Sequence, residues 1–566
     1  MSRRAAIWAS ALLAGAVVAF GVSRTLRLAW LADDSFISFR YAWNLAHGNG
    51  LVYNAGEFVE GYTNLLWTLL IAGAMALGVS PEVSSKALGI VFWVSLAGFL
   101  ALRSWRQRDR RPFIPLAAVL VLLMDDYQTW ATGGLETSMF TFLSVAGVLL
   151  ASEPRAHARR LLLAGTLLAA AVATRPDGVI FAAVGIAAAW FVNNDIPGRQ
   201  RLSLVASIAL PLMLAGAALA AFKLLYYGDL FPTAFYSKST LHPYYSQGLY
   251  YVYLFLKKNW FIAPLIVMLV IGSAGRVSAT LTRTNLVLLT AFSLFVAYVA
   301  HSGGDFMFAR RLIPAMPFLF LVLEDALASM PGALTKVAAI AIVALGVGLP
   351  YPIYPGTTEK IRGIADEPAY STKPYIGMRE AQAKVAAHAL AHVPVRAMFE
   401  GGMCMFGYYS RLPYLAEMSG LTQYSLAKKP LAARGYIGHE KAGDAQWLTE
   451  NRIQLIFSQA WPPVPRPEPR RVDEIYFGDT LKARIWIYVD AVMDPLRNNP
   501  GVQFVPIESA LRAAKRHIDQ ASYEEATAVY DFLERYYFQA AGPERKPLAD
   551  ELKEAVNARR AGKTGA

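Results

Sequence analysis

Residues 32–64, ADDSFISFRYAWNLAHGNGLVYNAGEFVEGYTN, form the most polar early segment of a strongly apolar chain. They follow an apolar run from Ile7 to Val22, so the adjacent carboxylates of Asp33 and Asp34 stand where a first membrane helix would emerge into water. Ionisable residues at a membrane boundary either serve a function or simply mark the end of a helix. The stretch therefore predicts a membrane protein with a candidate site in its first outer loop.

The composition indicates a polytopic membrane protein. Of the 566 residues, 55% are hydrophobic, the mean hydropathy is +0.34, and several apolar runs approach the roughly 20 residues needed to cross a bilayer. The net charge of +13 comes from arginines in short clusters between apolar runs, a pattern that sets membrane topology and does not require nucleic acid as a partner. Cys404 is the only cysteine, which excludes an intramolecular disulfide and a thiolate metal cluster.

The distribution of arginines decides which apolar runs cross the membrane. No small-x-small cleavage site follows the first run before Asp33, so this run is predicted to be a retained span with a cytoplasmic N-terminus. If segments 65–79 and 87–102 both crossed, the cluster RSWRQRDRR at 103–111 would lie outside. Because cytoplasmic loops carry the excess of Lys and Arg, segment 65–79 is predicted to lie in the interface instead.

This choice gives eleven predicted crossings and puts the later arginine-rich loops in the cytoplasm. The predicted spans are 7–22, 87–102, 112–124, 135–151, 161–174, 178–192, 203–226, 259–274, 284–300, 312–329 and 335–350. An odd number of crossings places the chain after about Pro355 outside the membrane. We therefore expect a membrane domain over residues 1–355 and an extracytoplasmic soluble domain over residues 356–566.

The second domain is predicted to be mixed α/β and to end in helices. Residues 377–392 have the pattern of an amphipathic helix, and the end of the chain over 508–560 resembles a single tetratricopeptide-like unit. The proline-rich segment WPPVPRPEPRR at 461–471 is predicted to be an extended connector. Strands are expected at VRAMFE (395–400), IQLIFSQ (453–459) and LKARIWIYVD (481–490).

The predicted outer loops gather acids, aromatic residues and cations in DDYQTWATGGLE (125–136), TRPDG (174–178), GDLFPTAFYSKS (228–239) and HSGGDFMFARR (301–311). Each also has a plainer interpretation: TRPDG as a turn, the glycines at 303–304 as a flexible link, and Lys238 as a side chain that snorkels at the interface. Arg310 and Arg311 could be interfacial anchors. An arginine doublet outside runs against the topology rule, however, and so favours function.

Several motifs in this order resemble the GT-C superfamily of membrane glycosyltransferases, and more narrowly the terminal β-(1→2) arabinofuranosyltransferase family of mycobacterial cell-wall synthesis. The resemblance covers most of residues 30–460 and extends to Glu400-Gly401-Gly402 through Tyr409 and to Gly438-His439-Glu440-Lys441. Within the membrane domain it is carried by Asp33 to Arg40, Glu60 to Asn64, Gly134 to Thr137, Thr174 to Gly178, Pro232 to Lys238 and Gly303 to Phe306.

The resemblance implies an enzyme that moves a sugar, with arabinofuranose as the leading choice, from a polyprenyl-phosphate donor to an envelope glycan or glycolipid on the outer face of the bacterial inner membrane. It implies no definite cofactor and leaves room for a divalent cation. Phe306 to Ala309 depart from the proline and glycine of many relatives, and the helical end past Glu508 has no match. Asp33 and Asp34 are the catalytic candidates, and the substrate-binding candidates are Arg40, Glu60, Tyr62, Asn64, Glu136, Arg175, Asp177, Tyr236, Lys238, Asp305, Arg310 and Arg311.

The chemistry of such a transfer fits these residue types. A base must take the proton of the acceptor hydroxyl, and cations must hold the departing phosphate, for which arginine has the better geometry. Neighbouring residues at a helix end point about 100° apart, so one of Asp33 and Asp34 is expected to be the base while the other orients it or pairs with Arg40. We slightly favour Asp33, which lies nearer the membrane surface.

Two other classes of protein remain as alternatives. A transporter or flippase of envelope lipids would need charges within its spans, whereas the charges here gather in loops on one side. A receptor or scaffold would not need eleven spans. In the enzyme, the outer domain is expected to position the acceptor and to take no part in the chemistry.

Overall fold

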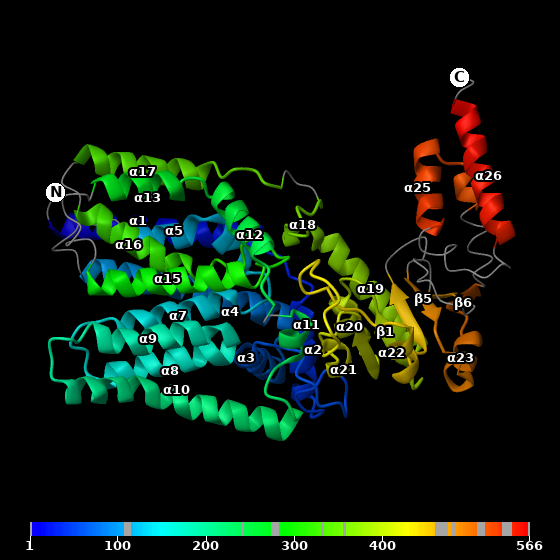
Figure 1. Cartoon of the computed structure of the whole chain (residues 1–566), viewed down its shortest axis with the longest axis horizontal. Helices are drawn as coiled ribbons and strands as arrows, with labels where there is room; N and C mark the ends of the chain where they lie inside the picture. The colour runs from blue at the N-terminus through cyan, green and yellow to red at the C-terminus, as the bar shows by residue number, and fades with distance from the viewer. Residues whose placement is uncertain are drawn as a thin grey trace. The chain divides into compact units, whose positions relative to one another are not determined.

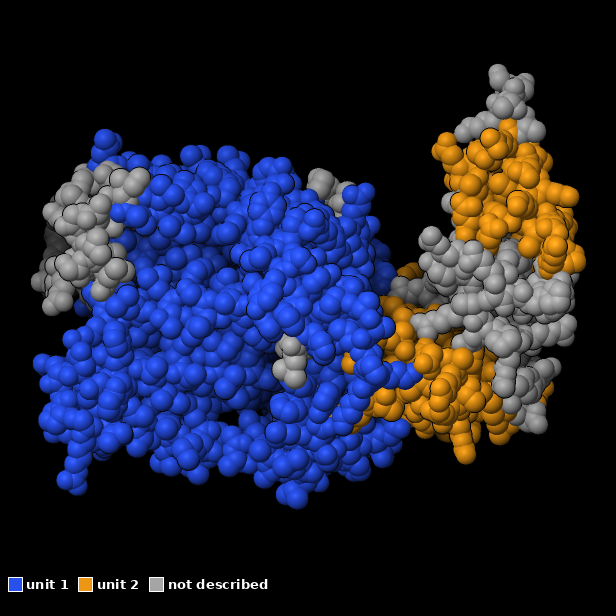
Figure 2. Space-filling view, in the orientation of Figure 1, with its two compact units in different colours: residues 1–375, 427–440 blue, residues 376–426, 441–566 orange. Residues whose placement is uncertain are grey.

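The computed structural model describes a mostly helical chain that forms two compact units, coloured separately in Figure 2. Unit 1 contains residues 1–375 and 427–440, and unit 2 contains residues 376–426 and 441–566. The described residues are 3–106, 115–239, 242–272, 282–329, 333–354, 358–458, 474–477, 481–487, 489–505, 515–534 and 546–563.

Unit 1 is built from helices (Figure 1). Most of them are apolar along their length, and their interior faces pack against one another. The helices are α1 (Arg3–Arg27), α2 (Ser35–Ala46), α3 (Leu65–Ala76), α4 (Pro81–Arg106), α5 (Leu116–Leu123), α6 (Asp125–Ala131), α7 (Thr137–Ala151), α8 (Ala158–Thr174), η2 (Pro176–Gly178), α9 (Val179–Phe191), α10 (Gly198–Tyr227), α11 (Thr233–Ser237), α12 (Tyr245–Lys258), α13 (Ile262–Gly272), α15 (Arg283–His301), α16 (Met316–Ser329), α17 (Ala333–Gly348) and α18 (Glu367–Tyr370).

Within the described residues, three helices have the length and composition to cross a membrane: α4, α10 and α15. Helix α12 and residues 262–268 of α13 qualify together, although they meet at an angle of 81°. Only 6% of the most apolar part of α10 is buried, as expected for a helix that faces lipid. The chain is a multi-pass membrane protein, while the count of eleven crossings stays a prediction.

The two ends of the helical bundle in unit 1 differ in character. Helices α2, α3 and α11, which carry or flank the predicted motifs, lie at one end in Figure 1. The turns after α7 and α9 and the start of α15 lie at the other end, where the Thr284 hydroxyl donates to the Ser152 carbonyl at 3.1 Å. Arg103 and Asp325 also approach to 3.6 Å. This separation agrees with the predicted grouping of the loops.

Helix α3 covers most of the segment predicted to lie in the interface. It has 12 residues, fewer than the roughly 20 that a crossing needs, and it lies beside α2 at the motif end of the bundle (Figure 1). Helix α4 then runs for 26 residues from that end to the other. These lengths fit the prediction that the segment of α3 lies in the interface and that the segment of α4 crosses the membrane. The place of α3 in the interface stays a prediction.

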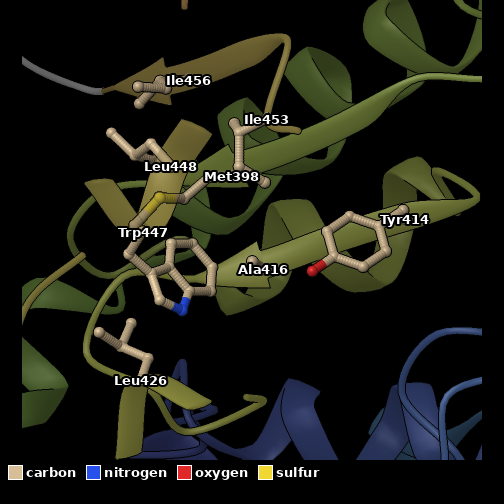
Figure 3. Close-up of a cluster of buried hydrophobic side chains, with 8 residues drawn as sticks. All are labelled: Met398, Tyr414, Ala416, Leu426, Trp447, Leu448, Ile453 and Ile456. Atoms are coloured by element: carbon tan, nitrogen blue, oxygen red, sulfur yellow. The ribbon is translucent and has the colours of Figure 1, made fainter. Parts of the chain in front are cut away.

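Unit 2 contains a six-stranded sheet together with helices. Its sheet has the order β2-β1-β3-β5-β4-β6, with β1 parallel to β2 and β3 and the remaining pairs antiparallel. A core of buried side chains, among them Met398, Trp447 and Ile456, packs beside the sheet (Figure 3). The strands are β1 (Arg396–Phe399), β2 (Tyr414–Glu417), β3 (Leu455–Ser458), β4 (Glu474–Phe477), β5 (Leu481–Ile485) and β6 (Val502–Val505).

The helices of unit 2 include the pair expected at the end of the chain. Its members, α25 and α26, share a small core that contains Ile518, Ala526 and Leu552, and a capping box at Ser522 begins α25. The predicted connector at 461–471 lies outside the described residues. The helices are α19 (Lys373–Ala389, which begins in unit 1), α20 (Cys404–Ser410), α21 (Tyr424–Ala427), α22 (Ala445–Glu450), α23 (Asp490–Arg497), α25 (Tyr523–Leu533) and α26 (Lys546–Lys563).

The border of the two units differs from the predicted domain boundary at residue 355. Residues after 357 still belong to unit 1 because their backbone pairs with the loop after α15: Ala365 donates to the Phe306 carbonyl at 2.7 Å and accepts from the Phe308 amide at 3.0 Å. Residues 427–440 also return to unit 1 from a chain that otherwise builds unit 2. Both segments contribute to the candidate site.

Candidate active site

The loop before α7 fixes the position of the acidic pair. The Ala32 amide donates to the Gly133 carbonyl at 2.9 Å, directly before the two aspartates. Gly134 has a φ of +79°, and a Cβ at this position would come within 2.8 Å of the Ser35 hydroxyl oxygen. Only glycine fits both the backbone conformation and the space. This approach holds the acidic pair at the start of α2.

The two aspartates differ in their surroundings. Both are half-buried. Asp34 stands at the N-cap of α2, yet its side chain makes no capping hydrogen bond, and among the described residues its carboxylate has no hydrogen bond or ion pair. Asp33, by contrast, already has an interaction partner. The structure therefore favours Asp34 as the available base, against the slight preference for Asp33 drawn from the sequence.

A buried ionic network lies at the same end of unit 1. Glu136 is 1% exposed and accepts from Arg310 at 2.9 Å and from the Asn64 amide at 2.9 Å, while Arg175 approaches to 3.7 Å. Arg175 also donates from Nε to Asp177 at 3.0 Å. Buried charges need partners of this kind. The network joins four of the predicted motifs, and its five side chains are largely occupied by one another.

Arg40 and Arg311 donate hydrogen bonds that stabilise the folded loops. Arg40 is 4% exposed and donates from Nε to the Tyr53 carbonyl at 2.8 Å. Arg311 donates from Nη1 to the Ser302 hydroxyl and to the Gly304 carbonyl, both at 2.9 Å. These contacts favour a structural role for both arginines, and their predicted role as phosphate ligands has no support from the geometry.

Three further predicted residues, from the first and fourth outer loops, form polar pairs around the end of α10. The pairs join the first outer loop to α10 and α11, and they account for Glu60, Tyr62 and Tyr236 as structural partners. They are Glu60 with Lys223 at 2.9 Å, Tyr62 with Tyr227 at 2.9 Å, and Tyr236 with Asp229 at 2.8 Å.

Glu367, which the sequence analysis missed, lies in a group of carboxylates. It begins α18 and is close enough to Asp34, Asp33 and Asp305 to be affected by their charges. Burial first, and then these three charges, raise the pKa of Glu367 to about 8. At neutral pH this carboxyl of Glu367 therefore keeps its proton.

Three rings and an ammonium form a wall, to which the segment returning to unit 1 contributes Tyr436 and His439. The rings of Tyr436 and His439 stack with their centroids 4.5 Å apart, and Phe306 meets the His439 ring edge-on at 5.2 Å. Lys360 donates from Nζ to the Tyr436 hydroxyl at 3.1 Å. Asp34 influences both Tyr436 and His439 electrostatically. The wall therefore lies close to the acidic pair.

Lys238 approaches the same wall from the end of α11. It is half-buried, and its Cε would lie 3.6 Å from a Cβ placed on Gly438. Among the described residues its ammonium has no hydrogen bond or ion pair. Its charge and that of Lys360 both act on His439. Two lysine ammoniums thus reach this region, and within the described part of the chain neither forms an ion pair with a carboxylate.

This arrangement changes the candidates for holding a phosphate. The sequence analysis preferred arginine, but Arg175 and Arg310 pair with carboxylates and Arg311 binds loop oxygens. The lysines are better placed. Lys238 belongs to a motif recognised in the sequence, whereas none of those motifs contains Lys360. His439 belonged to a quoted motif but had no predicted role.

A metal site is not evident in the described part of the chain. No group of three or more His, Cys, Asp or Glu side chains there is arranged to hold an ion. The divalent cation considered from the sequence stays a prediction.

The comparisons with known proteins match the motifs. The chain is 26% identical over 361 residues to the terminal beta-(1->2)-arabinofuranosyltransferase of Mycobacterium tuberculosis, which covers 55% of this chain and 54% of that protein. The protein of the same name from Corynebacterium glutamicum is 26% identical over 344 residues, or 54% and 48% of the two chains. The chain resembles the terminal β-(1→2)-arabinofuranosyltransferases. The resemblance predicted from the motifs is thereby confirmed.

The chain spans about half the length of these curated relatives. No protein-family model matches it. Among solved structures, ArnT from Cupriavidus metallidurans in the apo state has a TM-score of 0.49 at 12% identity and covers 86% of this chain and 98% of its own. The oligosaccharyltransferase of Archaeoglobus fulgidus has a TM-score of 0.44 at 11% identity, covering 78% and 68%.

Proposed function

We propose that this protein is an integral membrane glycosyltransferase. It transfers a sugar, with arabinofuranose as the leading choice, from a polyprenyl-phosphate donor to a glycan or glycolipid acceptor of the cell envelope. The observation that carries the proposal is the grouping of Asp34, which lacks a hydrogen-bond partner among the described residues, with Lys238 and Lys360 near one aromatic wall. The resemblance to the arabinofuranosyltransferases supports the choice of sugar.

In this reaction Asp34 takes the proton of the acceptor hydroxyl. The acceptor oxygen forms a bond to the anomeric carbon, and the bond from that carbon to the phosphate oxygen breaks. The electron pair leaves with the phosphate, whose growing negative charge is stabilised by Lys238 and Lys360. Asp34 then returns its proton to water, which completes the cycle without any further reactant.

The buried network supports this centre without touching the substrate. Glu136 holds Arg310, and Arg310 also approaches Asp305 to 4.0 Å. Asp305 and Phe306 follow directly on Gly304, whose φ of +77° sets the turn after α15. The network therefore fixes the loop that carries part of the carboxylate group and one ring of the wall.

The proposal includes a topology. The motif end of unit 1 faces the outside of the bacterial inner membrane, the N-terminus is cytoplasmic, and residues 376–426 and 441–566 form an extracytoplasmic domain. Because Tyr436 and His439 belong to unit 1, we revise the expected role of the later chain. A deletion from residue 371 onward would remove one wall of the site, so it is expected to impair donor binding as well as acceptor use.

A transporter or flippase of envelope lipids is the alternative. The buried pairs Glu136–Arg310 and Arg175–Asp177 lie at the motif end of unit 1, whereas a carrier would need charged groups along a path through the bundle. The arrangement therefore favours transfer chemistry over transport.

One experiment separates these functions. The purified protein is reconstituted in lipid with a radiolabelled polyprenyl-phosphate sugar and an oligosaccharide acceptor, and both transfer to the acceptor and counterflow across the membrane are measured. Transfer that is lost in Asp34→Asn supports the enzyme. Counterflow without transfer would overturn the proposal in favour of a carrier, and the absence of both would favour a scaffold.

A further inference from the structure

The aromatic wall is a built surface. Tyr436 and His439 stack with an angle of 27° between their rings, and Phe306 stands edge-on to His439 at 81°. Tyr436 is half-buried while His439 remains exposed. Rings fixed in this way present an apolar face with polar atoms at its rim, the arrangement that organic ligand sites use.

Several contacts hold the returning segment in place. Lys428 pairs with Asp229 at 2.6 Å at the start of the segment. Near its end, the fully buried side chain of Glu440 accepts from Arg434 at 2.8 Å. Gly363 has a φ of +77°, and a Cβ there would lie 2.7 Å from the Tyr436 ring. The segment is thus anchored at its start, braced internally near its end, and packed closely against Gly363 at Tyr436.

The hydrogen bonds of His439 determine which ring nitrogen faces a ligand. Its Nδ1 lies 3.3 Å from the Ile437 carbonyl oxygen, and because a carbonyl can only accept, Nδ1 carries the hydrogen. The lone pair of Nε2 is then available as an acceptor. Desolvation of the His439 ring by the surrounding protein lowers its pKa, and the charges of Lys238 and Lys360 lower it further, although the charge of Asp34 acts in the opposite direction. The ring therefore stays neutral at neutral pH.

We propose that Tyr436 and His439 bind the ring of the transferred sugar, and that His439 Nε2 accepts a hydrogen bond from one of its hydroxyls. This inference rests on the proposed function. Lys238 and Lys360 approach the wall closely enough to act on His439, so a phosphate held by them brings the sugar, one bond away, onto the stacked rings. Because the two rings stack on each other, the C–H face of the sugar packs against the exposed His439 side of the pair, which Tyr436 supports from behind, and its hydroxyls reach the polar rim.

The test compares two ligands that differ only in the sugar: a polyprenyl phosphate and the same lipid phosphate carrying arabinofuranose. Binding of each to the full-length protein in lipid nanodiscs is measured for the wild type and for variants. His439→Phe keeps a ring but loses the acceptor, and it is expected to weaken binding of the sugar-bearing ligand about tenfold while changing the bare phosphate less than twofold. Tyr436→Leu should also weaken binding of the sugar-bearing ligand more than binding of the bare phosphate.

Matched variants separate the sugar from the phosphate. Lys238→Gln should weaken both ligands alike, because both carry the phosphate. His439→Gln supplies an acceptor oxygen, so it should recover part of the preference for the sugar-bearing ligand that His439→Phe loses. Tyr436→Phe keeps the ring stacking and should keep that preference. Unchanged binding of the bare phosphate shows that a variant is folded.

The outcomes distinguish the two proposals. If the wild type binds neither ligand, the proposed function fails and the inference fails with it. If the wild type prefers the sugar-bearing ligand and both His439→Phe and Tyr436→Leu keep that preference, the inference is overturned while the proposed function stands. An equal loss for both ligands in variants that keep the wild-type midpoint of thermal unfolding would overturn the inference and assign the wall to the phosphate.

Discussion

Replacing Asp34 by Asn tests the centre of the proposed mechanism, with Asp33→Asn as the matched control one residue away. The change keeps the size of the side chain and removes its basicity. Asp34 makes no capping hydrogen bond, so the start of α2 loses no contact that would complicate the comparison. Loss of a general base costs about 10²- to 10⁴-fold in rate, or about 3–5.5 kcal/mol at 1.36 kcal/mol for each factor of ten.

A second effect of the same change follows from the position of Glu367. After burial, the charge of Asp34 contributes most to raising the pKa of Glu367 to about 8. Removing that charge lowers the pKa, so in Asp34→Asn Glu367 ionises at a lower pH than in the wild type. The fall in donor affinity that accompanies this ionisation is therefore expected to move to lower pH.

The assay is single-turnover transfer from a radiolabelled donor, with donor binding measured separately at several pH values. The expected result is slow transfer with intact donor binding at pH 7 in Asp34→Asn, and a much smaller loss in Asp33→Asn. A slow Asp33→Asn beside a normal Asp34→Asn would make Asp33 the base. Near wild-type transfer by both variants would refute the placement of the catalytic centre in the first outer loop.

Three further predictions concern stability, pH and topology. Glu136→Ala leaves buried arginine charges without their partner and should destabilise the protein by about 3–5 kcal/mol, seen as a lower midpoint of thermal unfolding, whereas a residue that only touches substrate would leave the midpoint unchanged. Wild-type donor affinity should fall as the pH rises through about 8, because ionised Glu367 adds a negative charge near the phosphate, and Glu367→Gln should abolish that fall. In intact cells lacking Cys404, an impermeant thiol reagent should label Asn49→Cys and not Arg199→Cys, two exposed positions at opposite ends of unit 1; the reverse labelling would invert the proposed topology.

The features that the sequence predicted are those that depend on short sequence patterns and on the contrast between lipid and water. Apolar runs identified the long helices, and the rule for arginines separated the loops into two groups that lie at opposite ends of the bundle in unit 1. Short strand-like segments identified β1 and β3, and alternation identified β5, in unit 2. In each case the signal lies within a few consecutive residues.

The candidate site was harder to predict because its parts meet only in the folded chain. The unusual arginine doublet at 310–311 was noticed for its position, but only the structure reveals Glu136 as the partner of Arg310, 174 residues away. Lys360 and Glu367 lie in a segment without a motif, and they join the site through backbone pairing with the loop at 306–308. No short sequence pattern predicts this backbone pairing.

The return of residues 427–440 to unit 1 sets an order of events during synthesis. A nascent chain that has reached residue 375 already holds Asp34, Lys238 and Glu367, yet it lacks the stacked rings of Tyr436 and His439. The strands β1 and β2 must be translated before those rings emerge. Under the proposed function, a partly made chain would therefore hold the base and one lysine without the surface proposed to bind the sugar, and the site would be complete only after residues 427–440 have returned to unit 1.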